Sequence, residues 1–512
     1  MTDPNIQDNL SEHERLSDEL ESRKGNLEKL MGLGIDPWGG RFECTHSASD
    51  LHARFDGFDR EKLEAPEVQV SMAGRLVALR EHGKVKFGNL LDGSGTIQLF
   101  FKIDVLSGSA VGQSGGANQW ELLDALNLGD WIGVGGTLMK TKTGELTVRV
   151  GEWRILAKSL RPLPEKYHGL KDKELRYRFR YLDLIANPEV REVFLARTEV
   201  VKAIRSVLDA RGFIEVETPS LHKVAGGAVA RPFSTHHNAL DIDVFLRISI
   251  ELHLKRLMIG GFERVYEIGR VFRNEGMDRD HNPEFTMLEA YQAFGNLDTM
   301  RELTEEICRE AFRRVRGSTL TNFRGNEIDF GAEFAMRDFS ELIREHAGID
   351  IRSNRDRAAL AKVCKERELE AEEGAPIRRL IDVIFDGLVQ PNLIQPTFVM
   401  NYPVEVSPLA KPHPDIPGFV QRFELYVAGH ELANAFTELN DPVDQRMRFQ
   451  QQALLRAAGD DEAHPVDEDF LYALEHGMPP AGGVGLGVDR LVMLVTGAHS
   501  IRDVILFPMM RQ

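Results

Sequence analysis

A chain of 512 residues with 42% hydrophobic and 28% charged residues can fold into roughly two to four globular domains with sizeable cores. It has no apolar run near about 18 residues, and its N-terminus is polar and acidic, so the sequence predicts neither a membrane span nor a signal or transit peptide. A formal net charge of −17 disfavours nonspecific nucleic-acid binding but is compatible with a local basic surface, a cationic substrate or Mg²⁺.

Residues 1–60 are expected to form a helical extension. Between residues 11 and 33, leucines recur at steps of three and four, the spacing of an amphipathic helix. Gly34, closely followed by Pro37, is a typical helix end.

Residues 61–160 are expected to form an OB-fold barrel. Five strand-like runs lie between residues 67 and 157, separated by turn signals such as Asp92-Gly93. The helical piece NQWELLDALNL stands between the third and fourth runs. That is the order of an OB-fold, which binds oligonucleotides on one face, although the pattern also allows another small barrel. A Gly/Ser-rich loop at 106–117 carries no evident chemistry.

A basic linker is expected at residues 161–185. Residues 158–180 hold eight Lys or Arg against three acids. The charge pattern is equally compatible with a solvated linker and with a surface that contacts a polyanion.

Residues 186–512 alternate helical and strand patterns, with no internal repeat. Helices are expected at 191–211, ending near Gly212, and at 298–315. A charged helical pattern at about 335–390 predicts an insertion, and GGVGLGVDRLVMLVTG near the C-terminus predicts a Gly-rich strand entering a helix.

One predicted strand has an unusual face. In EFTMLEAY, residues 284–291, alternation places Glu289 and Tyr291 on the same side as Phe285 and Met287. A solvated strand would turn its charge away from its apolar side chains. This strand is therefore expected to line a pocket.

Three stretches in order along the chain identify a family. They are RGFIEVETPSL, then VFRNEG with HNPEF, then GVGLGVDRLVML. Each is weak alone; the last could belong to a dinucleotide-binding fold, but no βαβ unit follows it. Together, behind a barrel, they resemble the signature motifs of class II aminoacyl-tRNA synthetases. RPLPEKYHGLKDKELRYRFRYLDL, ARPFSTHHNALDIDVFLRI, YPVEVSPLAK and ANAFTELNDP extend the resemblance to bacterial-type lysyl-tRNA synthetases over roughly residues 15–510.

The resemblance implies an α+β architecture: the OB-fold barrel, then a catalytic domain with an antiparallel sheet and flanking helices. It also implies a nucleotide site in which arginines stabilise charge on the phosphates of the co-substrate ATP, as phosphoryl chemistry requires. The implied catalytic residues are Arg273, Arg490 and Glu275, with His281, Asn282 and Phe285 completing the ATP site and Glu424 and Glu431 holding Mg²⁺.

The resemblance likewise implies an amino-acid site rich in carboxylates and poor in cations, which suits the two ammonium groups of lysine. Glu438 and Tyr291 are expected at the ε-amine and Glu251 at the α-amine. A side chain without a charge would leave a buried carboxylate unpaired, whereas ornithine differs by only about 1–3 kcal/mol. The implied lysine-binding residues are Glu251, Glu289, Tyr291, Asn434, Phe436, Glu438 and Gly485.

In the barrel, Phe87, Gln98 and Glu145 match family positions that contact the anticodon, and Arg80 is expected beside them. An aromatic ring that stacks on bases, with polar groups for their edges, is how single-stranded loops are read. A core role for Phe87 is the alternative.

The chain departs from the family at four positions near the site. Asp280 stands where arginine is frequent, so either Arg279 substitutes for that arginine or the phosphate contact there is weaker. Ile250 and His253 replace proline and tyrosine, and His430 replaces arginine. The His236-His237 pair has no metal-site spacing and is expected in the pocket wall or scaffold.

The expected function is that of a lysine–tRNA ligase that binds lysine, ATP and tRNA(Lys) as a homodimer paired through the first motif. Cys44, Cys308 and Cys364 are far apart, which fits a reducing compartment, and a cytoplasmic location is expected. The alternatives are a ligase that lysylates a protein, an aspartyl or asparaginyl synthetase, and a non-catalytic tRNA-binding homologue. The barrel, the acidic pocket and the intact motif arginines respectively disfavour them.

Overall fold

The chain divides into two compact units, Met1–Gly169 and Leu170–Gln512. The computed structural model describes residues 4–64, 67–108, 110, 111, 117–164, 170–457 and 465–511. Parts of the basic linker and of the Gly/Ser-rich loop therefore lie outside the described residues. Among the residues described, no helix has the length and apolar character needed to cross a bilayer.

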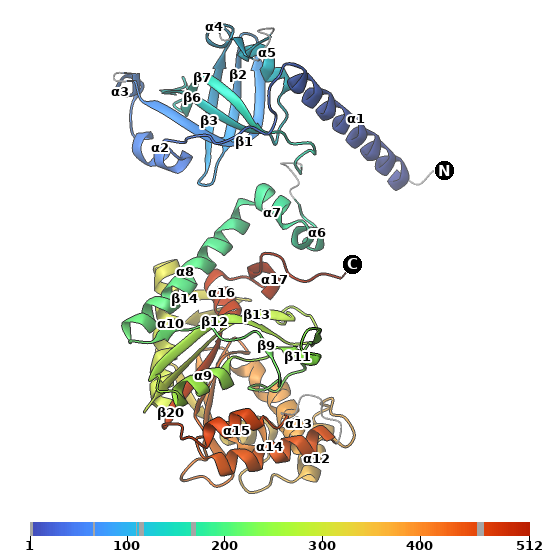
Figure 1. Cartoon of the computed structure of the whole chain (residues 1–512), viewed down its shortest axis with the longest axis vertical. Coiled ribbons are helices and arrows are strands. Elements are labelled where there is room, and N and C mark those ends of the chain that lie inside the picture. Colours follow the sequence, from blue (N-terminus) through green and yellow to red (C-terminus); the bar gives the residue numbers. More distant parts are fainter. Residues whose placement is uncertain are drawn as a thin grey trace. The chain divides into compact units, whose positions relative to one another are not determined.

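The first unit is a closed five-stranded barrel in the order β1-β2-β3-β7-β6 (Figure 1). Short helices between β3 and β6 confirm the predicted helical piece between the third and fourth long strands. The OB-fold prediction is thereby confirmed. The elements are α1 (Pro4–Gly32), α2 (Ala48–Phe55), α3 (Arg60–Glu64), β1 (Gln69–His82), β2 (Val85–Leu91), β3 (Thr96–Lys102), α4 (Ile103–Leu106), β4 (Ala110–Val111), β5 (Ala117–Asn118), α5 (Gln119–Leu122), β6 (Trp131–Lys140) and β7 (Leu146–Ala157).

Strand alternation fills this barrel. Along β3, Ile97, Leu99 and Phe101 are buried while the residues between them face outward. Where β6 pairs with β7, the register shifts between Gly135 and Gly136. A Cβ at Gly136 would lie 2.0 Å from the Arg149 main-chain oxygen, so the closure of the barrel here requires glycine.

The second unit is built on an eight-stranded sheet in the order β16-β17-β18-β19-β20-β13-β12-β8. Its central pairs are antiparallel, while β16 and β8 pair in parallel at the two edges. The strands are β8 (Ile214–Glu215), β12 (Arg264–Phe272), β13 (Glu284–Ala293), β16 (Ala335–Asp338), β17 (Thr397–Pro403), β18 (Phe419–Val427), β19 (His430–Thr437) and β20 (Ala481–Gly487).

Helices α8 (Pro188–Ala210), α10 (Leu297–Arg316) and α16 (Val488–Thr496) pack together on one face of this sheet (Figure 1). They confirm the helices predicted at 191–211 and 298–315. Asn296 begins α10 with a capping box, and Gly317 ends it with a left-handed φ of 65°. From β13, Leu288 and Ala290 enter this core, so the strand's other face is turned away from these helices.

The remaining helices and strands surround the sheet edges. The segment predicted as a helical insertion begins instead with β16, because pairing with β17 overrides the local helical pattern there. These elements are α6 (Lys173–Arg178), α7 (Arg180–Ala186), β9 (Leu221–His222), β10 (Ser234–His237), β11 (Ile242–Leu246), α9 (Glu251–Ile259), β14 (Leu320–Phe323), β15 (Asn326–Asp329), α11 (Phe339–Ala347), α12 (Arg357–Glu366), α13 (Ile377–Ile384), η2 (Phe385–Val389), α14 (Pro442–Ala457), α15 (Glu468–Leu474) and α17 (Ile501–Val504).

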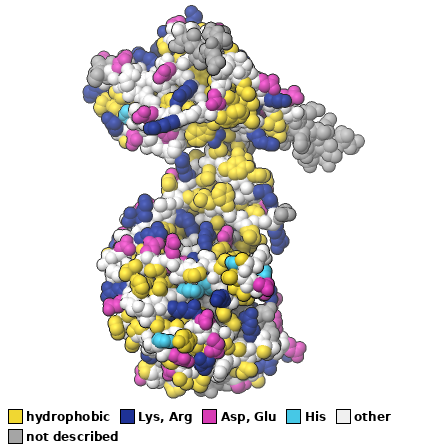
Figure 2. All heavy atoms as spheres, viewed as in Figure 1, with side chains coloured by type: hydrophobic (Ala, Val, Ile, Leu, Met, Phe, Trp, Pro, Cys, Tyr) yellow, Lys and Arg dark blue, Asp and Glu magenta, His cyan; other side chains and the backbone are white. Residues whose placement is uncertain are grey.

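Charges of both signs cover the visible surface of each unit. Figure 2 shows Lys and Arg side chains interspersed with Asp and Glu, without one continuous basic area on this face. The net negative charge is thus spread out, and recognition of a polyanion depends on local side chains.

Candidate active site

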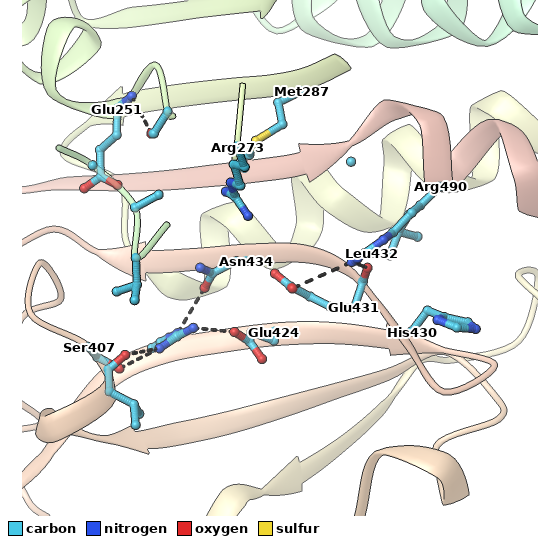
Figure 3. Close-up of a pocket in the computed structure, with 18 of the residues that line it drawn as sticks. Glu251, Arg273, Met287, Ser407, Glu424, His430, Glu431, Leu432, Asn434 and Arg490 are labelled. Atoms are coloured by element: carbon cyan, nitrogen blue, oxygen red, sulfur yellow. Dashed lines mark hydrogen bonds and ion pairs between the residues drawn. The ribbon is translucent and has the colours of Figure 1, made fainter. Parts of the chain in front are cut away.

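A cavity of about 700 Å³ opens over the sheet face opposite α8 and α10. Strands β13, β18, β19 and β20 form its floor, and the loop 273–283 and residues of η2 form part of its walls. Phe285, Met287, Glu289 and Tyr291 all line it, which confirms that this face of β13 borders a pocket. Figure 3 shows Arg273 and Arg490 directed into the same space as Glu424 and Glu431.

Arg273 stands at the base of the loop, where its main-chain N–H donates to Pro283 O at 2.8 Å. Its guanidinium lies 5.1 Å from the centre of the Phe285 ring, and its Nε has no hydrogen-bond partner. Burial lowers the pKa of this guanidinium, with Arg490 adding to the shift and Glu275 and Glu431 opposing it. Arginine stays protonated in such surroundings, so Arg273 is a half-buried cation whose Nε is free to donate to a ligand.

The other predicted nucleotide-site residues also line the cavity. Glu275 and His281 are exposed on the loop, and His281 contacts Asp278 at 2.8 Å. Asn282 is buried, donates to Glu284 O at 2.7 Å, and has an unpaired Oδ1. Arg490 donates to Glu431 O at 2.5 Å, and its Nη1 lies 3.7 Å from the Glu431 Oε2.

Glu424 and Glu431 approach each other from β18 and β19. Tyr402 and Tyr426 donate to Glu424 Oε2 at 2.8 and 2.5 Å. Burial and the nearby Glu424 carboxylate raise the pKa of Glu431. The described residues contain no cluster of three or more His, Cys, Asp or Glu suited to hold a metal by itself. Two neighbouring carboxylates that need phosphate oxygens to complete the shell fit Mg²⁺.

Arg422 belongs to the site, although the sequence analysis missed it. It forms an ion pair with Glu424, donates to Asn434 Oδ1 at 3.1 Å, and lies 5.5 Å from the Phe436 ring centre. Asn434 and Phe436 line the cavity as predicted. The arginine within the largely apolar strand FVQRFELYV was the available signal.

Two further carboxylates were missed. Asp382 and Asp386, one turn apart, line the cavity. Burial raises the pKa of Asp382 to about 6, and burial together with Asp382 raises the pKa of Asp386 to about 7. Their four-residue spacing in IDVIFDG shows only that they share a helix face.

Glu289 is held by three donors inside the cavity wall. Ser249 Oγ and the Ile250 N–H donate to Oε1 at 2.9 Å each, and Tyr291 OH donates to Oε2 at 3.0 Å. Burial, and then the charge of Glu251, raise its pKa to about 7. The departure at Ile250 matters here because a proline would have no N–H to donate.

The expectation of a site poor in cations is wrong in one respect. Lys255 Nζ lies 2.5 Å from Glu251 Oε1 and 2.5 Å from Glu438 Oε2, and all three side chains are buried. Burial disfavours the ammonium, but the two carboxylates raise the pKa of Lys255 overall, so it stays charged. The i,i+4 pair on α9 was visible in the sequence, but the approach of Glu438 was not.

Glu438 was also expected to face the ligand directly, yet it is fully buried and outside the cavity lining. Its Oε1 has no hydrogen-bond partner, and burial raises its pKa to about 8. It packs behind Gly483, where a Cβ would lie 2.2 Å from Glu438 Oε1 and 2.4 Å from Tyr291 Cε1. Gly485 lines the cavity as predicted.

For two of the open expectations, the structure removes one alternative: substitution by Arg279 and a place for the histidine pair in the pocket wall. Arg279 is exposed and outside the cavity lining, so its side chain does not replace an arginine at position 280. His236 and His237 lie on the exposed strand β10, where His236 contacts Asp243 at 2.9 Å, and neither belongs to the cavity wall.

In the barrel, the predicted anticodon residues lie close together in the β1-β2-β3-β7 sheet. Arg80 pairs with Phe87 across β1 and β2, and Gln98 donates to Glu145 at 2.8 Å. Phe87 is half-buried and outside the barrel core, which removes the core alternative. Phe100, which the sequence analysis overlooked, lies beside it with ring centres 5.2 Å apart.

Comparisons with known proteins match this geometry. Residues 172–511 match the family described as tRNA synthetases class II (D, K and N), and residues 70–156 match the OB-fold nucleic acid binding domain. The chain is 51% identical to a lysine–tRNA ligase of Thermoanaerobacter sp. (strain X514) over 99% of both chains. It is 51% identical to that of Moorella thermoacetica (97% of this chain, 98% of the relative) and 48% identical to that of Bacillus subtilis (strain 168) (98% of each).

Proposed function

Because the chain belongs to the class II tRNA synthetases (D, K and N), we propose that it activates lysine with ATP and transfers the lysyl group to the 3′ end of tRNA(Lys). The observation that carries this proposal is a single cavity that is lined by arginines in one part and by glutamates in another. Arg273 and Arg490 face one part of it, while Glu251 and Glu289 face another. A nucleotide polyphosphate and a cationic amino acid can therefore bind side by side.

At the nucleotide end, the lysine carboxylate attacks the α-phosphorus of ATP, and pyrophosphate leaves. Negative charge grows on phosphate oxygens, so fixed cations lower the barrier without a covalent nucleophile. Arg273 holds the α-phosphate, Arg490 holds the γ-phosphate end, and Phe285 stacks on adenine beside His281 and Asn282. Glu424 and Glu431 would hold Mg²⁺, which would supply positive charge to neutralise the phosphates.

At the lysine end, the charges match the ligand. Glu251 and Glu438 pair with one internal cation, Lys255, while Glu289 adds a third carboxyl group that accepts hydrogen bonds from neutral donors only. Lysine brings two ammonium groups, one of which is offset by its own carboxylate until that carboxylate reacts. An aspartate side chain would require a free cation, and Lys255 is already bound by two carboxylates, while the neutral amide of asparagine would leave the carboxylates of this end without a cationic partner.

The barrel recognises the anticodon through its outward aromatic and polar side chains. Phe87 and Phe100 offer neighbouring rings to unstacked bases, and Gln98 and Glu145 offer groups to base edges. Arg80, exposed at the end of β1, supplies charge for the phosphates.

The protein acts as a cytoplasmic homodimer paired through α8 and the segment after it. Leu195, Ile214 and Leu221 in this region are about half exposed, so a second copy of the chain would cover apolar side chains there. The exposed free thiol of Cys44 fits a reducing compartment. Light scattering of the purified protein tests the dimer directly.

The first experiment is ATP–pyrophosphate exchange with each of the twenty amino acids and ornithine, without tRNA. Exchange with lysine, and only weakly with ornithine, is expected. Exchange with aspartate or asparagine would contradict the assignment of the carboxylate end, and no exchange with any amino acid would support a non-catalytic homologue.

A further inference from the structure

A guanidinium outside the three motifs connects the two halves of the nucleotide site. Arg324 lies in the turn between β14 and β15, and its side chain is 14% exposed. It forms an ion pair with Asp280 and lies 2.6 Å from His430 Nε2. Since a guanidinium only donates, Nε2 of His430 accepts. Asp280 and His430 both line the cavity, and Arg324 lies behind them.

The turn that carries Arg324 is anchored in the core. Phe323 and Ile328 are buried in the main hydrophobic cluster, and Thr321 Oγ1 donates to Leu494 O of α16 at 3.0 Å. Arg324 itself has a positive φ of 52°, next to Gly325 at 88°. Asparagine or glycine would fit this backbone with less strain than arginine, so the conformation of the turn does not by itself explain an arginine at this position.

Contacts with other segments of the chain hold the loop 273–283 in place. Asn274 N donates to Arg231 O at 2.8 Å near its base, and Ile501 N donates to Arg279 O at 2.9 Å near its far end. The Arg324–Asp280 ion pair adds a charged contact next to His281 and Asn282. Arg324 Nη2 also donates to His499 O at 2.8 Å, which brings the segment before α17 into the same cluster.

We propose that Arg324 is a positioning residue for ATP, which fixes the loop 273–283 against β19 through Asp280 and His430. Asp280 precedes His281 and Asn282 on the loop, and His430 precedes Glu431 on the strand. One planar donor group that engages both neighbours sets the distance between the loop and the strand before ATP arrives. The inference rests on the proposed function, because it assigns Arg324 to the nucleotide end of that site.

The test compares Arg324→Asn with wild type, because Asn-Gly suits this turn while removing the guanidinium. In lysine-dependent ATP–pyrophosphate exchange, we expect KM for ATP to rise about tenfold and KM for lysine to change by less than about twofold. Arg324→Lys should recover only part of the effect, because an ammonium cannot engage both partners in one plane.

Asp280→Asn, alone and with Arg324→Asn, completes a double-mutant cycle. If the two residues act through one contact, the double variant is no worse than the worse single variant. The matched control is Arg309→Ala. Arg309 lies 5.0 Å from the centre of the Phe334 ring and donates to Phe330 O and Ala332 O, so it too holds a local contact. It lies outside the cavity lining. It should lower the melting temperature without changing KM for ATP.

An unchanged KM for ATP in Arg324→Asn, an equal rise in both KM values, or additive effects in the cycle would each overturn the inference. Calorimetric titration with ATP and Mg²⁺ separates this from a failure of the proposed function. Wild-type protein that does not exchange with lysine would contradict the function, while a weaker ATP affinity of Arg324→Asn would still support the role of Arg324.

Discussion

The two ends of the cavity are prepared for their ligands in opposite ways. At the nucleotide end, Arg273 is a half-buried cation whose Nε has no hydrogen-bond partner, so this donor is available to the ligand. At the lysine end, Glu289 accepts from three donors, and Lys255 joins Glu251 to Glu438. A guanidinium cannot lose its proton, whereas buried carboxylates can gain one, so the acidic end needs internal partners to stay competent without lysine.

The largest effect on activity is expected when Arg273 is replaced. Arg273→Ala removes the donor aimed at the reacting phosphate, and kcat for lysine-dependent exchange should fall by about 10²–10³. Arg205→Ala, which breaks a surface pair with Glu215, is the control and should leave kcat unchanged. A loss below about tenfold would mean that Arg273 is a structural cation only.

The second largest effect is expected at Glu438, one of the two carboxylates that pair with Lys255. Glu438→Gln leaves that ammonium with one carboxylate, and the kcat/KM for lysine should fall by roughly 100-fold while ATP still binds. Exchange kinetics with varied lysine measure this, with Glu345→Gln at the exposed Arg337 pair as control. Lysine kinetics like those of wild type would refute the role of Glu438 in the lysine site.

The barrel offers a contrast to both ends of the cavity, since its aromatic rings lie on the outer surface of strands and not in a cavity. Phe87→Ala should weaken tRNA charging by about tenfold, within the roughly 1–3 kcal/mol of one stacked base, and should spare exchange without tRNA. Phe58→Ala removes another exposed ring of the same unit and should affect neither reaction. A parallel loss in both reactions of Phe87→Ala would indicate damage to the fold instead.

The smallest expected effect is a pH dependence of lysine binding. The pKa of Glu289 is raised to about 7 by burial and by Glu251, so this carboxylate is protonated below that pH and attracts an ammonium group less. KM for lysine should therefore rise by up to about tenfold per pH unit below 7, and Glu289→Gln should abolish the rise.

The stability of the unliganded protein should also depend on pH through Glu289. Because the pKa of Glu289 in the folded state lies above its ordinary value of 4.5, the unliganded fold is favoured at low pH with respect to this group. That contribution is lost as the pH rises from about 4.5 to about 7, and the melting temperature of Glu289→Gln should vary less over that window. A flat KM profile for wild type would contradict both expectations.

The sequence by itself determined the features that depend on local pattern. Alternation of side chains predicted the barrel strands and the cavity face of β13, because a strand exposes every second residue to one side. Helical spacing predicted α8 and α10, and Gly212 indicated the end of α8. The resemblance to the class II motifs brought Arg273 and Arg490 into the prediction, and the fold places both in one cavity.

Only the tertiary structure decided which charges meet. Glu438 reaches Lys255 from just after the end of β19, 183 positions later in the chain. Asp386 approaches Glu424 from η2, and Arg324 reaches Asp280 from the β14-β15 hairpin. No local periodicity encodes such contacts, because they depend on how distant elements pack. For this reason the sequence analysis expected Glu438 to face the ligand directly. It also considered Arg279, rather than Arg324, as the guanidinium next to position 280.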